Sequence, residues 1–155
     1  NLNLGTLYMQ VGDVGGAIRH FEAERRLDPD DGRNLASLAQ AYGRSGQPEL
    51  AERTYAAAEE AGLEDAPALY NHAVCLERLE RPEEAEALYR RAVVADPTHA
   101  DSWNNLGVLK ARAGLVEEAV PLWRRALEHS PGHERALDNL DRARRLAEER
   151  TETGG

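Results

Sequence analysis

The chain has 155 residues, of which 30% are charged and 5% aromatic, and its formal net charge at pH 7 is −9. This negative charge argues against general nucleic-acid binding, which needs a basic surface. No apolar run approaches the length of a membrane span, so membrane insertion is not expected. A single cysteine, Cys75, excludes an internal disulfide.

In chain order, the sequence predicts pairs of helices and no strands, because Ala, Leu, Glu and Arg dominate and no segment alternates like a β-strand. Asp13 is a good N-cap, and Pro48 and Pro82 suit the first turn of a helix. The second helices of the pairs are expected at 14–27, 48–61, 82–95 and 116–129. Three of them follow a glycine at a tight turn, namely Gly12, Gly46 and Gly114.

The same side-chain chemistry returns every 34 residues. A small residue recurs at Gly5, Ala39, Ala73 and Gly107. Alanine recurs at Ala17, Ala51, Ala85 and Ala119. An aromatic ring follows four residues later, at Phe21, Tyr55, Tyr89 and Trp123, and the units close at Pro29, Leu63, Pro97 and Pro131. A constant period of this length indicates a stacked array of identical helical units.

These columns resemble the tetratricopeptide repeat, a helix–turn–helix unit of the same length. The resemblance implies an all-α, right-handed α-solenoid of four repeats, of which the first is truncated. The repeats are expected at 1–31, 32–65, 66–99 and 100–133. An amphipathic segment at 134–150 is expected to be a capping helix, because an array needs a terminal element with a polar outer face. Residues 151–155 are expected to be a polar tail.

Four positions of each first helix, spaced by four, three and four residues, form one stripe along the helix. In the tetratricopeptide-repeat family this stripe lines a concave groove that binds an extended peptide. The resemblance therefore implies a protein or peptide partner. The groove residues expected here are Asn3, Ser37, Gln40, Arg44, Asn71, Arg78, Asn105 and Arg112.

Asparagine recurs on the stripe at Asn3, Asn71 and Asn105, which we call the asparagine ladder. A carboxamide has one acceptor and two donors, so it can bond the N–H and C=O of a bound peptide without reading its side chains. The alternative is that these asparagines form hydrogen bonds between helices. The sequence leaves both interpretations open.

Arginine recurs at the end of the stripe at Arg44, Arg78 and Arg112, the arginine ladder. A cation in the last turn of a helix interacts with the negative end of the helix dipole, which contributes about 0.3–1 kcal/mol. The whole stripe holds four arginines and one aspartate on a strongly acidic chain. Such a groove is expected to attract an acidic peptide.

No catalytic, metal or cofactor site is predicted. His72 occupies a position that is leucine in other repeats and is expected to be a buried core residue, and Cys75 to be a structural thiol. His129 and His133 are separated by the helix-breaking Pro131, which argues against metal binding. The clamp with which some family members hold chaperone tails is absent, since its positions from repeat 2 onward hold Ala36, Gln40, Asn71, Asp101 and Asn105, with one match.

The leading hypothesis is a non-catalytic scaffold that binds an extended, acidic segment of a partner protein. The alternatives are a recruiting domain of a larger enzyme, such as a glycosyltransferase, and self-assembly into a homo-oligomer through the N-terminal repeat. The excess of arginine over lysine is typical of a GC-rich, bacterial genome. A cytoplasmic location is favoured, with the periplasm as the alternative if a signal sequence precedes Asn1.

Overall fold

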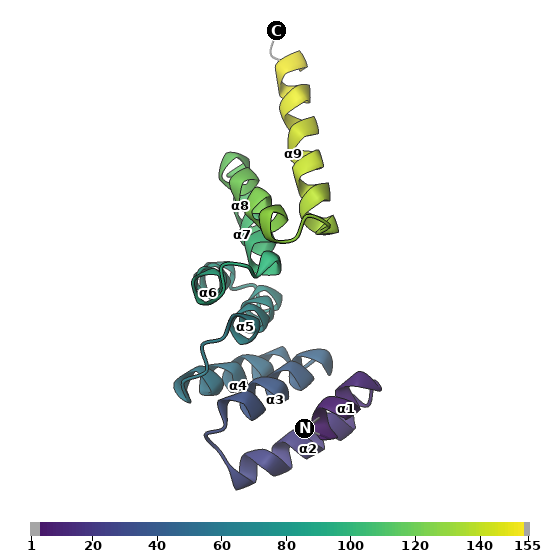
Figure 1. The fold of residues 1–155 in the computed structure, drawn as a ribbon, viewed down its shortest axis with the longest axis vertical. Coiled ribbons are helices and arrows are strands. Elements are labelled where there is room, and N and C mark those ends of the chain that lie inside the picture. The colour runs from purple at the N-terminus through teal and green to yellow at the C-terminus, as the bar shows by residue number, and fades with distance from the viewer. Residues whose placement is uncertain (1–3, 154–155) are drawn as a thin grey trace. The chain divides into compact units, whose positions relative to one another are not determined.

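The computed structural model describes residues 4–153, and these residues form nine α-helices and no strand (Figure 1). The helices are α1 (Leu4–Gln10), α2 (Val14–Leu27), α3 (Gly32–Arg44), α4 (Pro48–Glu60), α5 (Ala66–Arg78), α6 (Pro82–Ala95), α7 (Ala100–Arg112), α8 (Val116–His129) and α9 (Glu134–Thr153). The predicted all-α helical-repeat fold is confirmed. In the part of the chain that the structure describes, no helix has the length and apolar character needed to cross a membrane.

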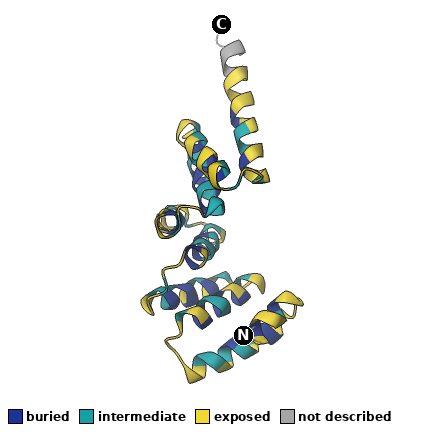
Figure 2. Cartoon of the chain, in the orientation of Figure 1, coloured by how far each residue is buried: buried dark blue, intermediate teal, exposed yellow. Residues whose placement is uncertain are grey.

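The chain divides into two compact units, unit 1 (Asn1–Ala85) and unit 2 (Glu86–Gly155). The boundary falls inside α6 and not between two of the expected repeats. Within unit 1, α1 packs on α2 and α3 on α4, while α7 packs on α8 within unit 2. Buried residues lie where paired helices face each other, and the exposed ones lie on their outer sides (Figure 2).

Local signals explain where the helices begin. Asp13 accepts a hydrogen bond from the Gly16 N–H at 2.7 Å, as an N-cap should. Pro48 and Pro82 are the first residues of α4 and α6, as predicted. In unit 2, two histidines take the place of capping aspartates: His99 caps α7, and His133 Nδ1 accepts from the Ala136 N–H at 3.2 Å.

The turns between paired helices use a left-handed residue. Gly12, Gly46 and Gly114 have φ angles of 84°, 78° and 81°, as the repeat pattern predicts. The corresponding residue of the third repeat is Glu80, whose φ is 57°. Glu80, although it carries a side chain, therefore adopts a backbone conformation that favours glycine.

The recurring small residues let aromatic rings lie directly against a neighbouring helix. In unit 1 a Cβ added to Gly5 would overlap the ring of Phe21, and in unit 2 one added to Gly107 would overlap the indole of Trp123. Phe21 and Trp123 are both buried. Each ring fills the space that the missing side chain leaves, so close packing holds the two helices of a repeat together.

The C-terminal helix is longer than the sequence predicts. It begins at Glu134 as predicted but continues to Thr153, so the expected helix 134–150 is too short and the expected tail 151–155 is helical in part. Its buried side runs through Ala136 and Ala143, whereas Leu137 is 46% exposed. The contact with α8 is thus formed by these two alanines together with the partly buried Leu140. Helix α4 also ends one residue before the predicted position.

Candidate functional site

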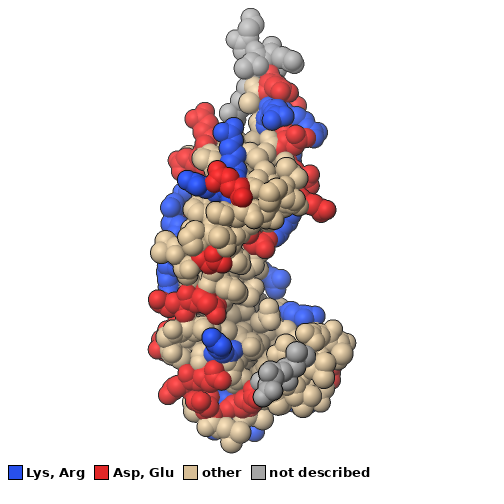
Figure 3. Space-filling model, in the orientation of Figure 1, with Lys and Arg blue, Asp and Glu red and all other residues tan. Residues whose placement is uncertain are grey.

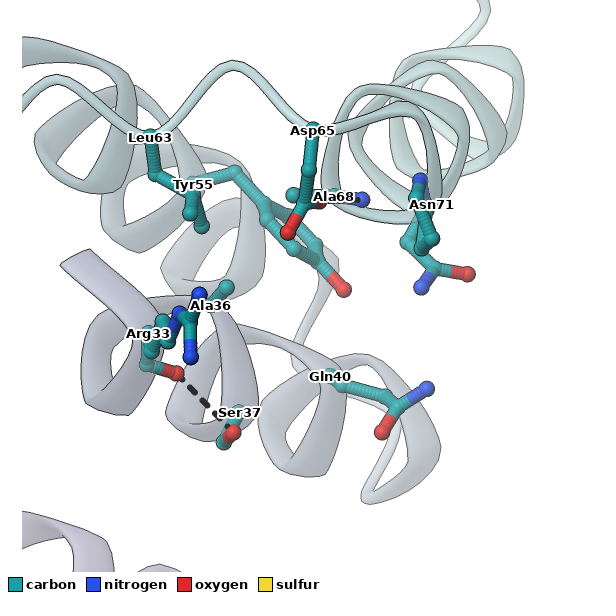
Figure 4. A pocket seen from close by; sticks show the side chains of 10 residues that line it. Arg33, Ala36, Ser37, Gln40, Tyr55, Leu63, Asp65, Ala68 and Asn71 are labelled. Carbon is teal, nitrogen blue, oxygen red and sulfur yellow. Dashed lines mark hydrogen bonds between the residues drawn. The ribbon is translucent and has the colours of Figure 1, made fainter. Parts of the chain in front are cut away.

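Unit 1 contains a pocket between α3 and α5, with one side chain of α4 reaching into it (Figure 4). Its volume is about 280 Å³, and we call it the unit 1 pocket. The pocket combines polar groups with small apolar walls. It is lined by Arg33, Ala36, Ser37, Gln40, Tyr55, Leu63, Asp65, Pro67, Ala68 and Asn71.

Three of the predicted groove residues, Ser37, Gln40 and Asn71, line this pocket together. Gln40 extends from α3 and Asn71 from α5 on the same side of the pocket (Figure 4). Neither carboxamide hydrogen-bonds another described side chain or backbone group of the protein. The Ser37 hydroxyl instead donates to the Arg33 carbonyl at 2.9 Å, within its own helix.

Tyr55 reaches from α4 into the space between α3 and α5 (Figure 4). Its side chain is 4% exposed, and its ring stacks on His72 with a centroid distance of 5.4 Å. Burial raises the pKa of the Tyr55 hydroxyl well above its usual range, so the group stays protonated and can donate. No described residue accepts that proton, which leaves the donor available to a ligand.

The asparagine ladder is not uniform. In unit 2 the Asn105 Nδ2 donates to the Tyr89 hydroxyl at 2.9 Å, and its Oδ1 accepts from Asn104 Nδ2 at 3.0 Å. The bond to Tyr89 joins α7 to α6, so Asn105 forms an interhelical hydrogen bond as the second interpretation expects, while its bond with Asn104 lies within α7. Asn71 forms none with the described residues, and Asn3 lies outside them.

The arginine ladder connects successive repeats within unit 1. Arg44 Nη1 donates to the Met9 carbonyl at 3.2 Å, and Arg78 Nη1 donates to the Gly43 carbonyl at 3.1 Å. Both acceptors lie in the last turn of the preceding first helix, where carbonyls lack helical partners and the dipole is negative. Arg112 belongs to unit 2 and lines a separate pocket there. The structure thus gives Arg44 and Arg78 a structural contact.

The charge around the unit 1 pocket is mixed. Arg33 lies at its rim, and Asp65 lines it while accepting a hydrogen bond from the Ala68 N–H at 2.9 Å as the N-cap of α5. Acidic and basic side chains are interspersed over the face that Figure 3 shows. This face carries no broad basic area of the kind that nucleic acid requires.

Two candidate reactive groups are buried and engaged. His72 Nδ1 lies 2.5 Å from Glu59 Oε1, which confirms the predicted core histidine. Cys75 is also buried, its Sγ donates to the Pro48 carbonyl at 3.1 Å, and burial raises the pKa of its thiol. A raised thiol pKa disfavours the nucleophilic thiolate. No group of three or more His, Cys, Asp or Glu side chains placed to hold a metal ion occurs in residues 4–149.

Sequence reasoning did not assign Tyr55 to the site. The repeat pattern predicts for its position only a ring that fills the space between helices. The signal that could have identified it is chemical, because the equivalent residue of the first repeat is Phe21 and only a tyrosine carries a hydroxyl toward the helix stripe.

Helical pairs in constant register, packed through small residues and rings, define a helical-repeat protein. Three family models, each described as tetratricopeptide repeat, match residues 2–33, 36–100 and 88–120. The chain belongs to the tetratricopeptide-repeat family. A comparison with curated protein sequences finds no match.

Solved structures share the fold at low sequence identity. The crystal structure of MamA has a TM-score of 0.79 at 19% identity, over 98% of this chain and 99% of that one. YrrB, a tetratricopeptide-repeat protein with an unusual peptide-binding site, has a TM-score of 0.79 at 22% identity, over 95% and 76%. PilF from Pseudomonas aeruginosa has a TM-score of 0.85 at 23% identity, over 96% and 67%. At these identities the likeness concerns the fold.

Proposed function

We propose that the protein is a non-catalytic scaffold that binds an extended segment of a partner protein in the unit 1 pocket. The observation that carries the proposal is the convergence of three polar groups without internal partners: the carboxamides of Gln40 and Asn71 and the hydroxyl of Tyr55. Polar groups placed in a concave pocket and left without partners are suited to bind a ligand.

The chemistry of these groups suits a peptide main chain. Each carboxamide offers two donors and an acceptor, so Gln40 and Asn71 can each bond both the N–H and the C=O of an extended strand. The Tyr55 hydroxyl adds a donor for a carbonyl oxygen. The small walls formed by Ala36 and Ala68 leave room for the backbone to come near.

The charges of unit 1 favour an acidic segment. The stripe positions of this unit include Arg33, Arg44 and Arg78 and no acidic residue. Arg33 lines the pocket itself, and the carboxylate of Asp65 is already engaged in capping α5. Opposite charges of this kind raise the rate of association and select among partners more than they raise affinity.

Family membership and the likeness to YrrB support a protein-binding role. A recruiting domain within a larger enzyme would use the same pocket for the same purpose. Self-association through α1, where Leu4 and Leu7 are exposed, is a separate prediction that does not involve this pocket.

The test compares the affinities of variants for a partner captured from the source organism. Gln40→Ala and Asn71→Ala should each weaken binding about fivefold, since one hydrogen bond is worth about 1 kcal/mol. Arg33→Gln should weaken it most at low salt, because exposed charges are screened as ionic strength rises.

Two controls separate binding from folding. Arg53→Ala, an exposed change on α4 outside the pocket, should leave both affinity and stability unchanged. Asn105→Ala removes the hydrogen bonds to Tyr89 and Asn104, so it should lower the free energy of unfolding. Wild-type affinity in both the Gln40→Ala and the Asn71→Ala variants would refute the proposal.

A further inference from the structure

Unit 2 has a pocket of its own with different chemistry. It lies between α7, α8 and α9, has a volume of about 440 Å³, and is called here the unit 2 pocket. Its apolar part includes Val108, Val116 and Leu146 beside the Trp123 indole, and its basic part consists of Arg112 and Arg142.

This pocket opens where the arginine ladder ends. The 34-residue register that links Arg44, Arg78 and Arg112 continues to Leu146 on α9. In unit 1 the ladder arginines extend across to a carbonyl of the preceding first helix. A leucine is shorter and has no donor, so Leu146 makes no such contact and is 50% exposed at the pocket. The pocket beside Leu146 is therefore apolar at the position where unit 1 has the guanidinium of Arg44 or Arg78.

The charge beside this apolar space is positive and available. Arg142 is exposed and makes no ion pair with the described residues. It occupies the stripe position of Gln40, where unit 1 has a neutral side chain. A guanidinium binds a carboxylate through two parallel N–H donors, which fixes the orientation of the acid as well as its charge.

We infer that the unit 2 pocket binds a partner segment in which a bulky apolar side chain stands next to a carboxylate. The apolar side chain lies among Val108, Val116 and Leu146, and the carboxylate pairs with Arg142. This site recognises side chains, whereas the unit 1 pocket suits a main chain. The inference therefore goes beyond the proposed function and does not depend on it.

The direct test is an NMR titration of the ¹⁵N-labelled full chain with the tetrapeptide Gly-Leu-Glu-Gly, acetylated and amidated at its ends. Binding with a Kd on the order of 1 mM is expected for so small a probe. Chemical-shift changes should concentrate at Val108, Val116 and the Trp123 indole N–H. The counterpart with glutamine in place of glutamate should bind several-fold more weakly.

Variants on α9 make the test specific. Leu146→Arg restores the ladder residue and should abolish the shifts by filling the pocket. Leu137→Arg is the matched control, since Leu137 is also exposed on α9 but does not line the pocket, and it should bind the peptide like the wild type. Arg142→Gln should remove the preference for the glutamate peptide over the glutamine peptide.

Three results would overturn the inference. These are the absence of shifts at about 10 mM peptide, ten times the expected Kd, equal shifts in Leu146→Arg and wild type, and equal binding of the glutamate and glutamine peptides. Circular dichroism of Leu146→Arg checks that its helices are intact. None of these variants changes Gln40 or Asn71. A negative result here would therefore not bear on the proposal that the unit 1 pocket binds a partner segment.

Discussion

At the scale of single residues, Glu80 is the residue whose backbone conformation fits its side chain least. It stands at the turn position where the other repeats have Gly12, Gly46 and Gly114, and its φ of 57° is left-handed. A left-handed non-glycine residue costs about 1–2 kcal/mol. Glu80→Gly should therefore raise the free energy of unfolding by about 0.5–1 kcal/mol, after the larger entropy of glycine in the unfolded chain is allowed for. Urea denaturation measures the change.

The reciprocal change provides the control. Gly46 has a φ of 78° in the same kind of turn, and a Cβ there would meet no other atom within 4 Å. Gly46→Ala should lower stability through backbone strain alone. If the urea midpoint of unfolding falls in Glu80→Gly, the left-handed backbone of Glu80 is not strained and this account is wrong.

The sequence predicts which residues pack closely between helices better than it predicts which side chains form hydrogen bonds. The small residues at Gly5 and Gly107 were expected where helices pack closely, and both lie against an aromatic ring. The partner of each ladder asparagine could not be predicted, because Asn71 and Asn105 both follow a tyrosine of the preceding repeat, Tyr55 and Tyr89, and only Asn105 bonds it. Asn105 finds the Tyr89 hydroxyl, whereas Asn71 finds no internal partner, although the two share one position in the repeat.

At the scale of helices, most boundaries could be predicted because capping signals are local. Asp13, Pro48 and Pro82 begin helices where the sequence indicates. The histidine caps were not predicted, because histidine is not among the usual N-cap residues. The predicted end of α9 is too early, since the polar composition of 151–155 favours a tail, whereas the helix continues to Thr153.

A partly buried ion pair between helices gives unit 2 a pH-dependent contact. Lys110 Nζ on α7 lies 2.9 Å from Glu86 Oε1 on α6, with side chains only 15% and 27% exposed. The hydrogen bond from Lys110 holds the pKa of Glu86 below its usual range, and Arg90 adds to the effect. Lys110→Met should lower the free energy of unfolding by about 1 kcal/mol at pH 7.

The sign of the pH dependence follows from the lowered pKa. The contact stabilises the fold above the unfolded pKa of Glu, about 4.3, and the stabilisation is lost as the pH falls through the folded pKa. The stability difference between wild type and Lys110→Met should therefore shrink as the pH falls below the unfolded pKa of Glu and vanish once Glu86 is protonated in the folded state. Arg90→Met, which removes an exposed partner of the same carboxylate, should cost less. A stability difference that is the same at pH 7 and pH 3 would contradict this account.

At the scale of the whole molecule, the repeat fold could be predicted because the same types of residue recur at the helix contacts of every unit. Four copies of one column pattern leave little freedom in the fold. The division into two units within α6 could not be predicted, since no change in the pattern marks it. The pockets depend on departures from the repeat, such as Leu146 in place of a ladder arginine. Such departures become visible when the register is continued beyond the last full repeat.

The central claim is that a partner segment occupies the unit 1 pocket, and site-specific photocrosslinking in living cells tests it most directly. A photoreactive phenylalanine analogue replaces Gln40 in one variant and Arg53, on the outer side of unit 1, in another. We expect a crosslinked partner protein from position 40, none from position 53, and a weaker crosslink when Asn71→Ala is added. Equal crosslinking from both positions, or crosslinking from position 53 alone, would contradict the account.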